Sequence, residues 1–325
     1  MSTTLTTKEA PAGGDPSPSW ISERSGRGDA IFKGLTIAAA ALILLALASV
    51  FIFLFTQGFA GFTQPAEVYS KYGSSFWGYV WPLLASTIVA SLIALIIAVP
   101  LAIGIALVIT QYAPSWLSTP VAYVIDLLAA VPSVVFGLWG AVTFAGFLQP
   151  FYVWLNDNLG WIPLFGGQAS ATGNTILTAS LVLAVMILPI MTAICREVFL
   201  QAPRLHEEAA LALGATRWEM IRTAVIPFGR SGVVSAAMLG LGRALGETMA
   251  VLMILSPGLL YSFKILQAGQ QQTIAANIAA DFPEANPLGV SALIATGLAL
   301  FVITLLVNMG ARAIVARRKD FSGAN

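Results

Sequence analysis

Ionisable side chains are rare in the apolar stretches of this sequence, and three stand out: Asp126, Arg243 and Glu247. A charge at the centre of a membrane helix costs about 2.5–3.5 kcal/mol on the insertion scale, so each is expected to face protein or water. Arg243 and Glu247 are four residues apart in the expected fifth helix, so they should share one face and lie close enough to form an ion pair. Arg243 would then lie near the membrane midplane, about 20 Å into its helix.

Two interpretations of Arg243 and Glu247 are open. The pair could be structural and hold a helix bundle together, as Gly242 and Gly246 could do by letting another helix pack closely. Alternatively, the forked donors of Arg243 could bind an anion that crosses the membrane, with phosphate as the best fit, while Glu247 holds or releases the guanidinium. For Asp126, near the cytoplasmic end of its expected helix, a structural role is favoured.

Other chemistry finds little support in the sequence. Cys195 and His206 are the single cysteine and the single histidine, too few for a zinc site. No nucleophile-and-base arrangement is evident, and no lysine lies between a glycine and a serine or threonine as a Walker A motif requires. The net charge of +1 gives no basic surface for nucleic acid. We therefore expect no catalytic residues, no cofactor, no metal and no nucleic-acid partner.

The elements that must position these residues are membrane helices. Hydrophobic residues make up 58% of the 325 residues and charged residues 10%, whereas soluble proteins carry about 25% charged residues. A spanning helix needs about 20 predominantly apolar residues. Six such stretches are present, at about 34–56, 80–110, 120–148, 175–195, 231–256 and 288–311. The sequence thus predicts an all-α membrane protein with six transmembrane helices in one domain over residues 31–320, after a disordered cytoplasmic tail over residues 1–30.

Basic residues indicate the orientation, because cytoplasmic loops of membrane proteins are rich in Lys and Arg. Thirteen Lys and Arg fall in the tail, the loop after the fourth stretch and the C-terminal segment, which share one side if both termini are cytoplasmic. The opposite side keeps Lys71 and Lys264, and its aromatic segment 150–165 is expected to lie along the membrane interface. The loop over 111–119 has no Lys or Arg, so its side follows from the helix count alone.

Residues 196–230 are too long and too patterned for a simple connection. Pro203 can open a helix, and Gly214 stands where helices commonly end in the left-handed conformation. Thr216 and Glu219 have the spacing of a capping box for a second helix, which Pro227 should end or kink. The loop therefore predicts two helices joined by a tight turn. They could lie flat on lipid, but the acids of the first helix favour a protein partner.

One motif in this loop resembles that of a known family. It reads Glu208-Ala209-Ala210, then Gly214, then Ile226-Pro227. This pattern closely resembles the EAA loop of the membrane subunits of binding-protein-dependent ABC importers. The resemblance implies a MetI-like permease fold and a short helix that docks on a cytoplasmic ATPase. The residues that it assigns to ATPase coupling are Glu208, Ala209, Ala210 and Gly214.

A second resemblance concerns the expected fifth helix. The run over residues 240–251 resembles the signature of phosphate-importer permeases of the PstC type, and residues 130–137 also look like this family. Sulfate and molybdate permeases are similar around the arginine but continue differently after Glu247. The resemblance implies a substrate pathway formed by Arg243, Glu247, Thr248 and Ser133.

The resemblance also implies a set of partners. These are a sister permease of the PstA type, a cytoplasmic ATPase dimer, an extracellular phosphate-binding protein, inorganic phosphate and the lipid of a bacterial plasma membrane. Two alternatives stay open: a sulfate- or molybdate-type ABC permease, and a secondary anion transporter or channel. The last class would use an ion gradient and would need no coupling loop.

Overall fold

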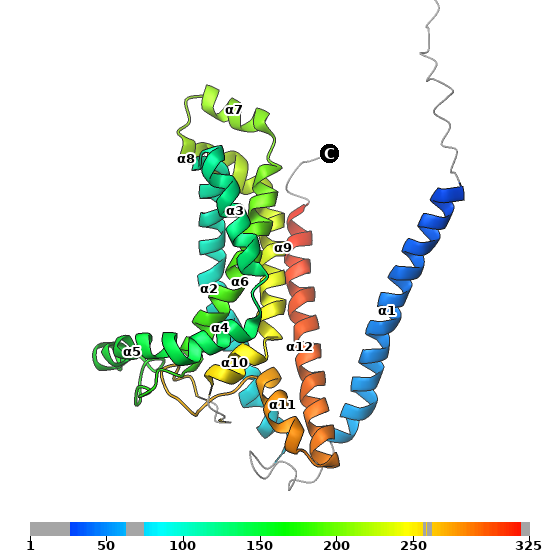
Figure 1. Ribbon diagram of the computed structural model, residues 1–325, viewed down its shortest axis with the longest axis vertical. Coiled ribbons are helices and arrows are strands. Elements are labelled where there is room, and N and C mark those ends of the chain that lie inside the picture. The colour runs from blue at the N-terminus through cyan, green and yellow to red at the C-terminus, as the bar shows by residue number, and fades with distance from the viewer. Residues whose placement is uncertain (1–26, 63–74, 256–257, 259–261, 320–325) are drawn as a thin grey trace, which may run out of the picture. The chain divides into compact units, whose positions relative to one another are not determined.

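The computed structural model describes residues 27–62, 75–255, 258 and 262–319 (Figure 1). These residues form helices and no strand. Six helical stretches among them are long and apolar enough to cross a membrane, which confirms the expected all-α membrane fold. The predicted tail lies outside the described residues up to position 26, and its last four residues are helical, because α1 begins at Arg27.

The chain divides into two compact units, Met1–Phe51 and Ile52–Asn325. In the first unit the structure describes one element, the N-terminal part of α1 (Arg27–Phe62). Its leucine, isoleucine and phenylalanine side chains are exposed on all sides. A helix that is apolar all round is suited to lipid or to burial in a larger assembly.

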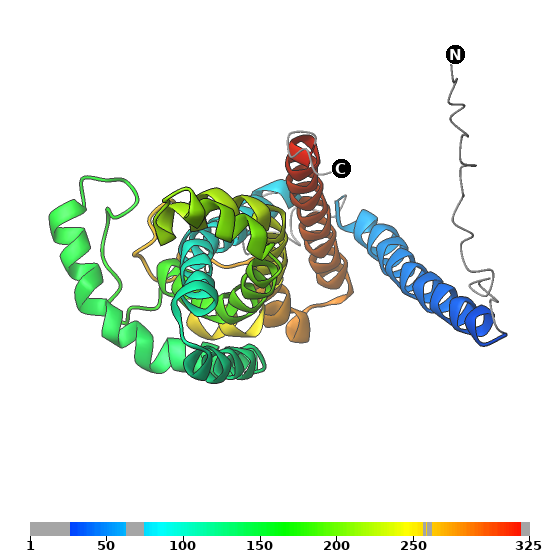
Figure 2. The same ribbon diagram turned by 90° about the horizontal axis from the view of Figure 1, so that it is seen from above.

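The second unit holds the other helices. Four of them are long: α2 (Phe76–Leu107), α6 (Ile176–Leu200), α9 (Ile226–Leu245) and α12 (Pro287–Lys319). The shorter α-helices are α3 (Ser115–Ala129), α4 (Ser133–Trp139), α5 (Ala145–Leu159), α7 (Arg204–Ala212), α8 (Arg217–Met220), α10 (Met249–Ile254) and α11 (Ile274–Asp281). Three π turns, η2 (Val108–Tyr112), η3 (Gly140–Phe144) and η4 (Ile221–Val225), and the 3-10 turn η5 (Phe282–Glu284) join some of them. Figure 2, seen from above, shows α2, α6 and α9 gathered around one axis, with α12 beside them.

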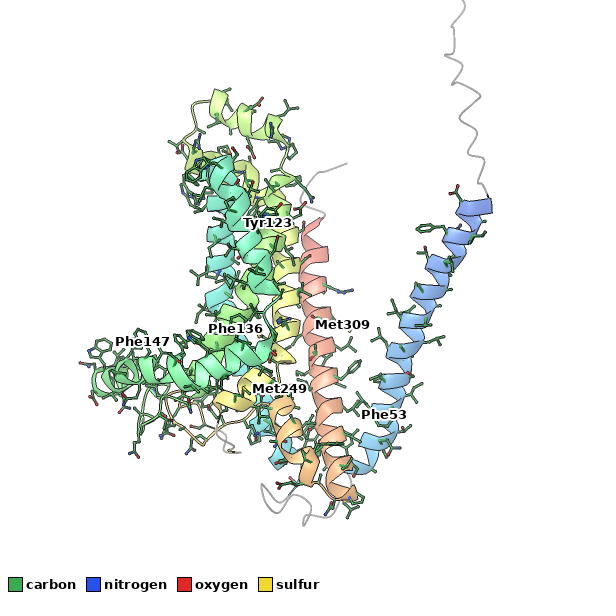
Figure 3. The ribbon with its side chains drawn as sticks, in the orientation of Figure 1. Phe53, Tyr123, Phe136, Phe147, Met249 and Met309 are labelled. Atoms are coloured by element: carbon green, nitrogen blue, oxygen red, sulfur yellow. The ribbon has the colours of Figure 1, made fainter. Side chains whose placement is uncertain are left out.

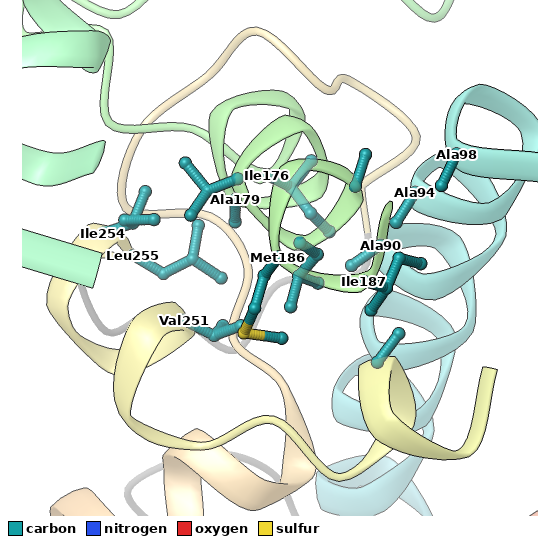
Figure 4. Packing of buried hydrophobic residues seen from close by; sticks show 14 of the residues in the cluster. Ala90, Ala94, Ala98, Ile176, Ala179, Met186, Ile187, Val251, Ile254 and Leu255 are labelled. Carbon is teal, nitrogen blue, oxygen red and sulfur yellow. The ribbon is translucent and has the colours of Figure 1, made fainter. Parts of the chain in front are cut away.

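Small residues let these central helices approach closely. Ala90, Ala94 and Ala98 recur at every fourth position of α2, are almost completely buried, and face α6 (Figure 4). Residues four apart share one helix face, and small side chains there let two backbones pack together. On α9, a methyl group added to Gly240 would come within 2.8 Å of the Met191 sulfur of α6. The core of the unit is therefore α6, held between α2 and α9.

Two of the expected spans are broken. The stretch expected over 120–148 ends as α3 at Ala129 and resumes as α4 at Ser133, and α4 and α5 run across the direction of α2 and α6 (Figure 1). Pro132 explains this break, since proline has no N–H to donate and forces the preceding residue out of the helical region. The stretch expected over 231–256 ends as α9 at Leu245, with Gly246 as its C-cap, and resumes at Met249.

Pro227 was expected to end or kink the second helix of the loop. The helix does not end there but continues through η4 into α9, where Pro227 occupies the first turn, and the kink stays a prediction. Within η4 the Ile226 N–H bonds to the Ile221 carbonyl, five residues back. The π turn η4 lies just before Pro227, so the change in hydrogen-bond register coincides with a residue that has no N–H to donate.

Candidate functional site

A cavity of about 820 Å³ opens between α6, α9 and α12. Arg243 lines it from the last turn of α9, together with Gly242. Within the described residues, no atom lies within 4 Å of a methyl group built on Gly242. The predicted close packing of a second helix at Gly242 and Gly246 is therefore not seen in this chain. Gly242 borders open space, and Gly246 ends the helix.

Arg243 is half-buried, and its charge has no partner among the residues that the structure describes. Its Nε atom is buried and makes no hydrogen bond, and no ion pair involves Arg243 among the residues that the structure describes. A guanidinium in an apolar helix bundle is costly unless its N–H groups are hydrogen-bonded and its charge is neutralised by an opposite charge. The geometry thus leaves a positively charged group at the wall of a cavity, with donors available to a ligand or to another subunit.

Glu247 lies beyond the end of α9, so the predicted same-face ion pair with Arg243 is wrong. The helix ends between the two residues, with Gly246 as its C-cap. The Glu247 Oε1 atom instead accepts a hydrogen bond of 3.1 Å from the Ala250 N–H, in the first turn of α10. A carboxylate in this position satisfies an otherwise unpaired N–H and interacts favourably with the helix dipole.

The helix breaks before α4 and before α10 lie close together, because these two short helices pack on each other. Gly137 of α4 packs on Ala250 of α10, where an added Cβ atom would come within 2.6 Å of the Ala250 Cα atom, and Gly140 packs on Ile254. Residue numbers increase together along the two contacts, so α4 and α10 run parallel and begin at the same end. This end gathers three of the predicted pathway residues: Ser133, Glu247 and Thr248. The Thr248 hydroxyl donates to the Gly246 carbonyl at 3.2 Å and so helps to hold the break.

The predicted helical pair after α6 is confirmed. Helix α7 begins after Pro203, and Gly214 has a φ of +86°, in the left-handed region that glycine adopts without strain. The capping box is complete: Thr216 N donates to Glu219 Oε2 at 2.7 Å, and Glu219 N donates to Thr216 Oγ1 at 3.3 Å. Local sequence signals were sufficient to predict this helical pair, because the residues that start and end each helix lie next to it in the chain.

Helix α7 presents the motif residues to a partner. None of its side chains is buried, Glu208 and Ala209 are exposed, and Ala210 is half-buried against the core. Leu213, in the turn after α7, is 89% exposed. An apolar and acidic surface of this kind is suited to contact with another protein. Arg217 connects this surface to the α2–α3 junction, because its guanidinium donates a hydrogen bond of 3.3 Å to the Gln111 carbonyl.

Asp126 lies in the last turn of α3, about 16 Å from the helix start at Ser115, whereas a position near the first end of its helix was expected. It is exposed and lines a cavity of about 440 Å³ together with Arg196 of α6. The buried Nε atom of Arg196 has no hydrogen-bond partner among the described residues. This proximity could not be predicted from the sequence, because the two residues are far apart in the chain.

Aromatic residues gather on the crosswise helix α5. Phe147 is 76% exposed (Figure 3), and the rings of Phe151 and Trp154 are stacked with centroids 6.1 Å apart. Exposed aromatic side chains of this kind favour the membrane–water interface. The placement of 150–165 along that interface stays a prediction.

Six apolar helical stretches, a guanidinium without an ion pair among the described residues and an exposed helical pair are features of a multi-pass membrane subunit that binds another protein. The sequence pattern of the family "Binding-protein-dependent transport system inner membrane component" matches residues 98–320. The chain belongs to this family. It is therefore a permease component of the bacterial inner membrane, as its EAA-like loop indicated.

Several named relatives are similar to this chain. "Phosphate transport system permease protein PstC 2" of Mycobacterium tuberculosis is 54% identical over 213 residues, which cover 63% of this chain and 64% of the relative, slightly less than two thirds of its length. "Phosphate transport system permease protein PstC" of Xylella fastidiosa (strain Temecula1) is 40% identical and is covered over 98% of both chains. A solved bacterial ABC transporter for import of the acidic polysaccharide alginate shares the fold, with a TM-score of 0.59, 18% identity, and coverage of 90% of this chain and 96% of that one.

Proposed function

We propose that this chain is a membrane-spanning permease subunit of an ATP-driven phosphate importer and forms half of its translocation pathway. The observation that carries the proposal is the unpaired Arg243 at a cavity of about 820 Å³, beside a helix break. Non-helical backbone at membrane depth is tolerated where it is buried in protein or lines a water-filled cavity. The names of the relatives supply the substrate class.

Each predicted site residue has a role in this proposal. Arg243 offers forked, charged donors to a phosphate oxygen pair, a geometry that an ammonium group cannot reproduce. Ser133 and Thr248 supply hydroxyls at the adjoining helix breaks, and Glu247 fixes the start of α10. Phosphate carries one or two negative charges, and an interior-negative membrane opposes its entry by about 2.3 kcal/mol per charge per 100 mV. Uptake from a scarce supply therefore needs the energy of ATP.

The ATPase is a separate subunit in this proposal, and α7 is its docking element. Glu208, Ala209, Ala210 and Gly214 form the contact and its turn. The other partners are a sister permease of the PstA type, an ATPase dimer and an external phosphate-binding protein. The turn after α7, the α2–α3 junction and the end of α12 lie at one end of the second unit (Figure 1), which supports a common cytoplasmic side. Both termini are cytoplasmic in this orientation.

The test is phosphate-stimulated ATP hydrolysis by the complete complex in proteoliposomes. Arg243→Ala should abolish the stimulation, and Arg243→Lys should restore little of it, because lysine keeps the charge but loses the fork. In the same preparations Glu208→Lys should reduce copurification of the ATPase, whereas Glu284→Lys, an exposed acid on η5, should not.

Three results would contradict the proposal. Anion transport by the purified chain without a bound ATPase would indicate a secondary transporter or channel. Stimulation by sulfate or molybdate but not by phosphate would indicate the other permease type. Unchanged uptake in Arg243→Ala would reduce Arg243 to a structural residue.

A further inference from the structure

The cavity that contains Arg243 has a second arginine. Arg312 lines it from α12, together with Asn308 one turn earlier, both within one turn of Met309, which Figure 3 labels. The sequence placed Arg312 only among the basic residues of the C-terminal segment. None of the described residues that line the cavity is an acid, so both guanidinium groups face it without a neutralising carboxylate.

The cavity runs along α9 and α12, from the helix break toward the end of the unit that carries α7. On α9 its lining runs over about two and a half turns, from Val234 to Arg243, a length of about 13 Å. Helices α9 and α12 run in opposite directions, because α9 leads away from α8 and α12 ends on the side of α8 (Figure 1). Arg312 therefore lies toward the α7 end of the cavity, and Arg243 toward the helix break.

Asn308 is the second unusual group. It lies in a helix that is apolar enough to cross a membrane, and its side chain makes no hydrogen bond with the described residues. A polar side chain inside a membrane protein usually faces a partner or a pathway. The nearby Ser235 hydroxyl is already engaged, since it donates to the Ser231 carbonyl at 3.0 Å. Free donors at this end of the cavity thus come from Asn308 and Arg312.

We propose that Arg312 and Asn308 form a second oxyanion site, which receives phosphate from Arg243 on the cytoplasmic side of the pathway. This inference rests on the proposed function. A pathway must bind its ion well enough to admit it and weakly enough to release it, and several weak sites in series meet both needs. A single arginine would retain the phosphate ion, whereas a second positive group nearer the cytoplasmic side provides a binding site to which the ion can move.

The experiment measures phosphate uptake by the complete complex in proteoliposomes. Arg312→Ala should lower the maximal uptake rate at least about tenfold, the loss expected for one charge-assisted contact. The phosphate concentration at half-maximal rate should change less than about twofold, because loading at Arg243 is untouched. Arg312→Lys should recover part of the rate, and Asn308→Ala should slow uptake several-fold. Asn308→Ala also serves as the second test if Arg312→Ala assembles poorly.

A charge-relocation variant separates this role from a general effect of basic residues on orientation. The double variant Arg312→Ala/Ala313→Arg keeps the net charge and depth but turns the guanidinium about 100° around the helix. Ala313 is exposed and is not among the residues that line the cavity. The double variant should stay as slow as Arg312→Ala. Wild-type rates in the double variant, or in Arg312→Ala itself, would overturn the second site.

Lipid composition distinguishes the two ligands that could bind Arg312 and Asn308, which are inorganic phosphate and the phosphate of a lipid headgroup. The ratio of wild-type to Arg312→Ala rates should be equal in vesicles of phosphatidylcholine alone and in vesicles that also contain anionic phosphatidylglycerol. A ratio near one in phosphatidylcholine alone would assign the site to a lipid headgroup and overturn the inference. If the wild-type complex imports no phosphate at all, the proposed function fails instead, so the two failures are distinguishable.

Discussion

Arg243 and Glu247 lie on either side of a helix end, and their side chains have different surroundings. The Glu247 carboxylate accepts from the Ala250 N–H, whereas Arg243 keeps an unbonded Nε atom at the cavity. The sequence was sufficient to single out both residues, since a charge in an apolar run is rare. It could not predict their separation, which depends on the end of α9 at Gly246, nor the approach of Arg312 from the last helix.

Glu247→Gln and Glu247→Ala should differ in stability. Glutamine keeps an oxygen that can accept from the Ala250 N–H, whereas alanine leaves that N–H unpaired. We expect Glu247→Ala to lose about 1 kcal/mol, as for other helix caps, and Glu247→Gln to lose clearly less. The midpoint of thermal unfolding in detergent measures both. Equal losses in the two variants would mean that the hydrogen bond to Ala250 does not stabilise the start of α10.

At the scale of helices, local signals predicted the α7–α8 pair well and hydropathy predicted the breaks poorly. Pro203, Gly214 and the Thr216–Glu219 capping box each act within a few residues, so the sequence displays them directly. The breaks near 130–132 and 246–248 lie inside stretches whose mean hydropathy predicts one continuous span each. Hydropathy reports how much a segment favours lipid and carries no information on where its backbone stops being helical.

The packing of α4 on α10 should depend on Gly137. An added methyl group would meet the Ala250 Cα atom at 2.6 Å, so one of the two short helices must shift. We expect Gly137→Ala to destabilise the chain by about 1–3 kcal/mol and to lower uptake, because the displaced helices carry Ser133 and Thr248. Thermal unfolding and uptake of the reconstituted complex measure the two effects.

Gly146→Ala is the matched control on the neighbouring helix. Gly146 lies in α5, and a methyl group there would meet nothing within 4 Å among the described residues. Alanine is favoured over glycine within a helix by roughly 0.5–1 kcal/mol, so this variant should be neutral or slightly stabilising. If Gly137→Ala behaved like Gly146→Ala, the close contact of α4 with α10 would not be needed for stability.

At the scale of the whole molecule, composition and charge were sufficient for the fold class. The six apolar stretches and the family membership agree with the prediction, while the crosswise course of α4 and α5 escaped it. Orientation rests on the basic residues, and the structure adds that Arg217 bonds to the Gln111 carbonyl. This bond brings the uncharged junction 111–119 to the same end as α7, a relation that loop charge could not supply.

Thiol labelling tests the orientation. Leu213→Cys and Trp161→Cys place a reactive group in two exposed positions, one after α7 and one after α5. An impermeant maleimide added to intact cells should label the variant at 161 and leave the variant at 213 unlabelled until the membrane is opened. The native Cys195 is buried, so the parent chain serves as the unlabelled control. Labelling at 213 in intact cells would reverse the orientation.

The position of Arg243 beside the gap between α9 and α10 also bears on how a cell makes this chain. A guanidinium that meets hydrocarbon instead of protein or water is costly. In a newly inserted copy without its partner subunits, acyl chains could reach the Arg243 side chain, and the copy would be less stable in the bilayer. Membrane proteases remove such orphans, so surplus copies would be degraded and the subunit ratio would be set by assembly rather than by synthesis.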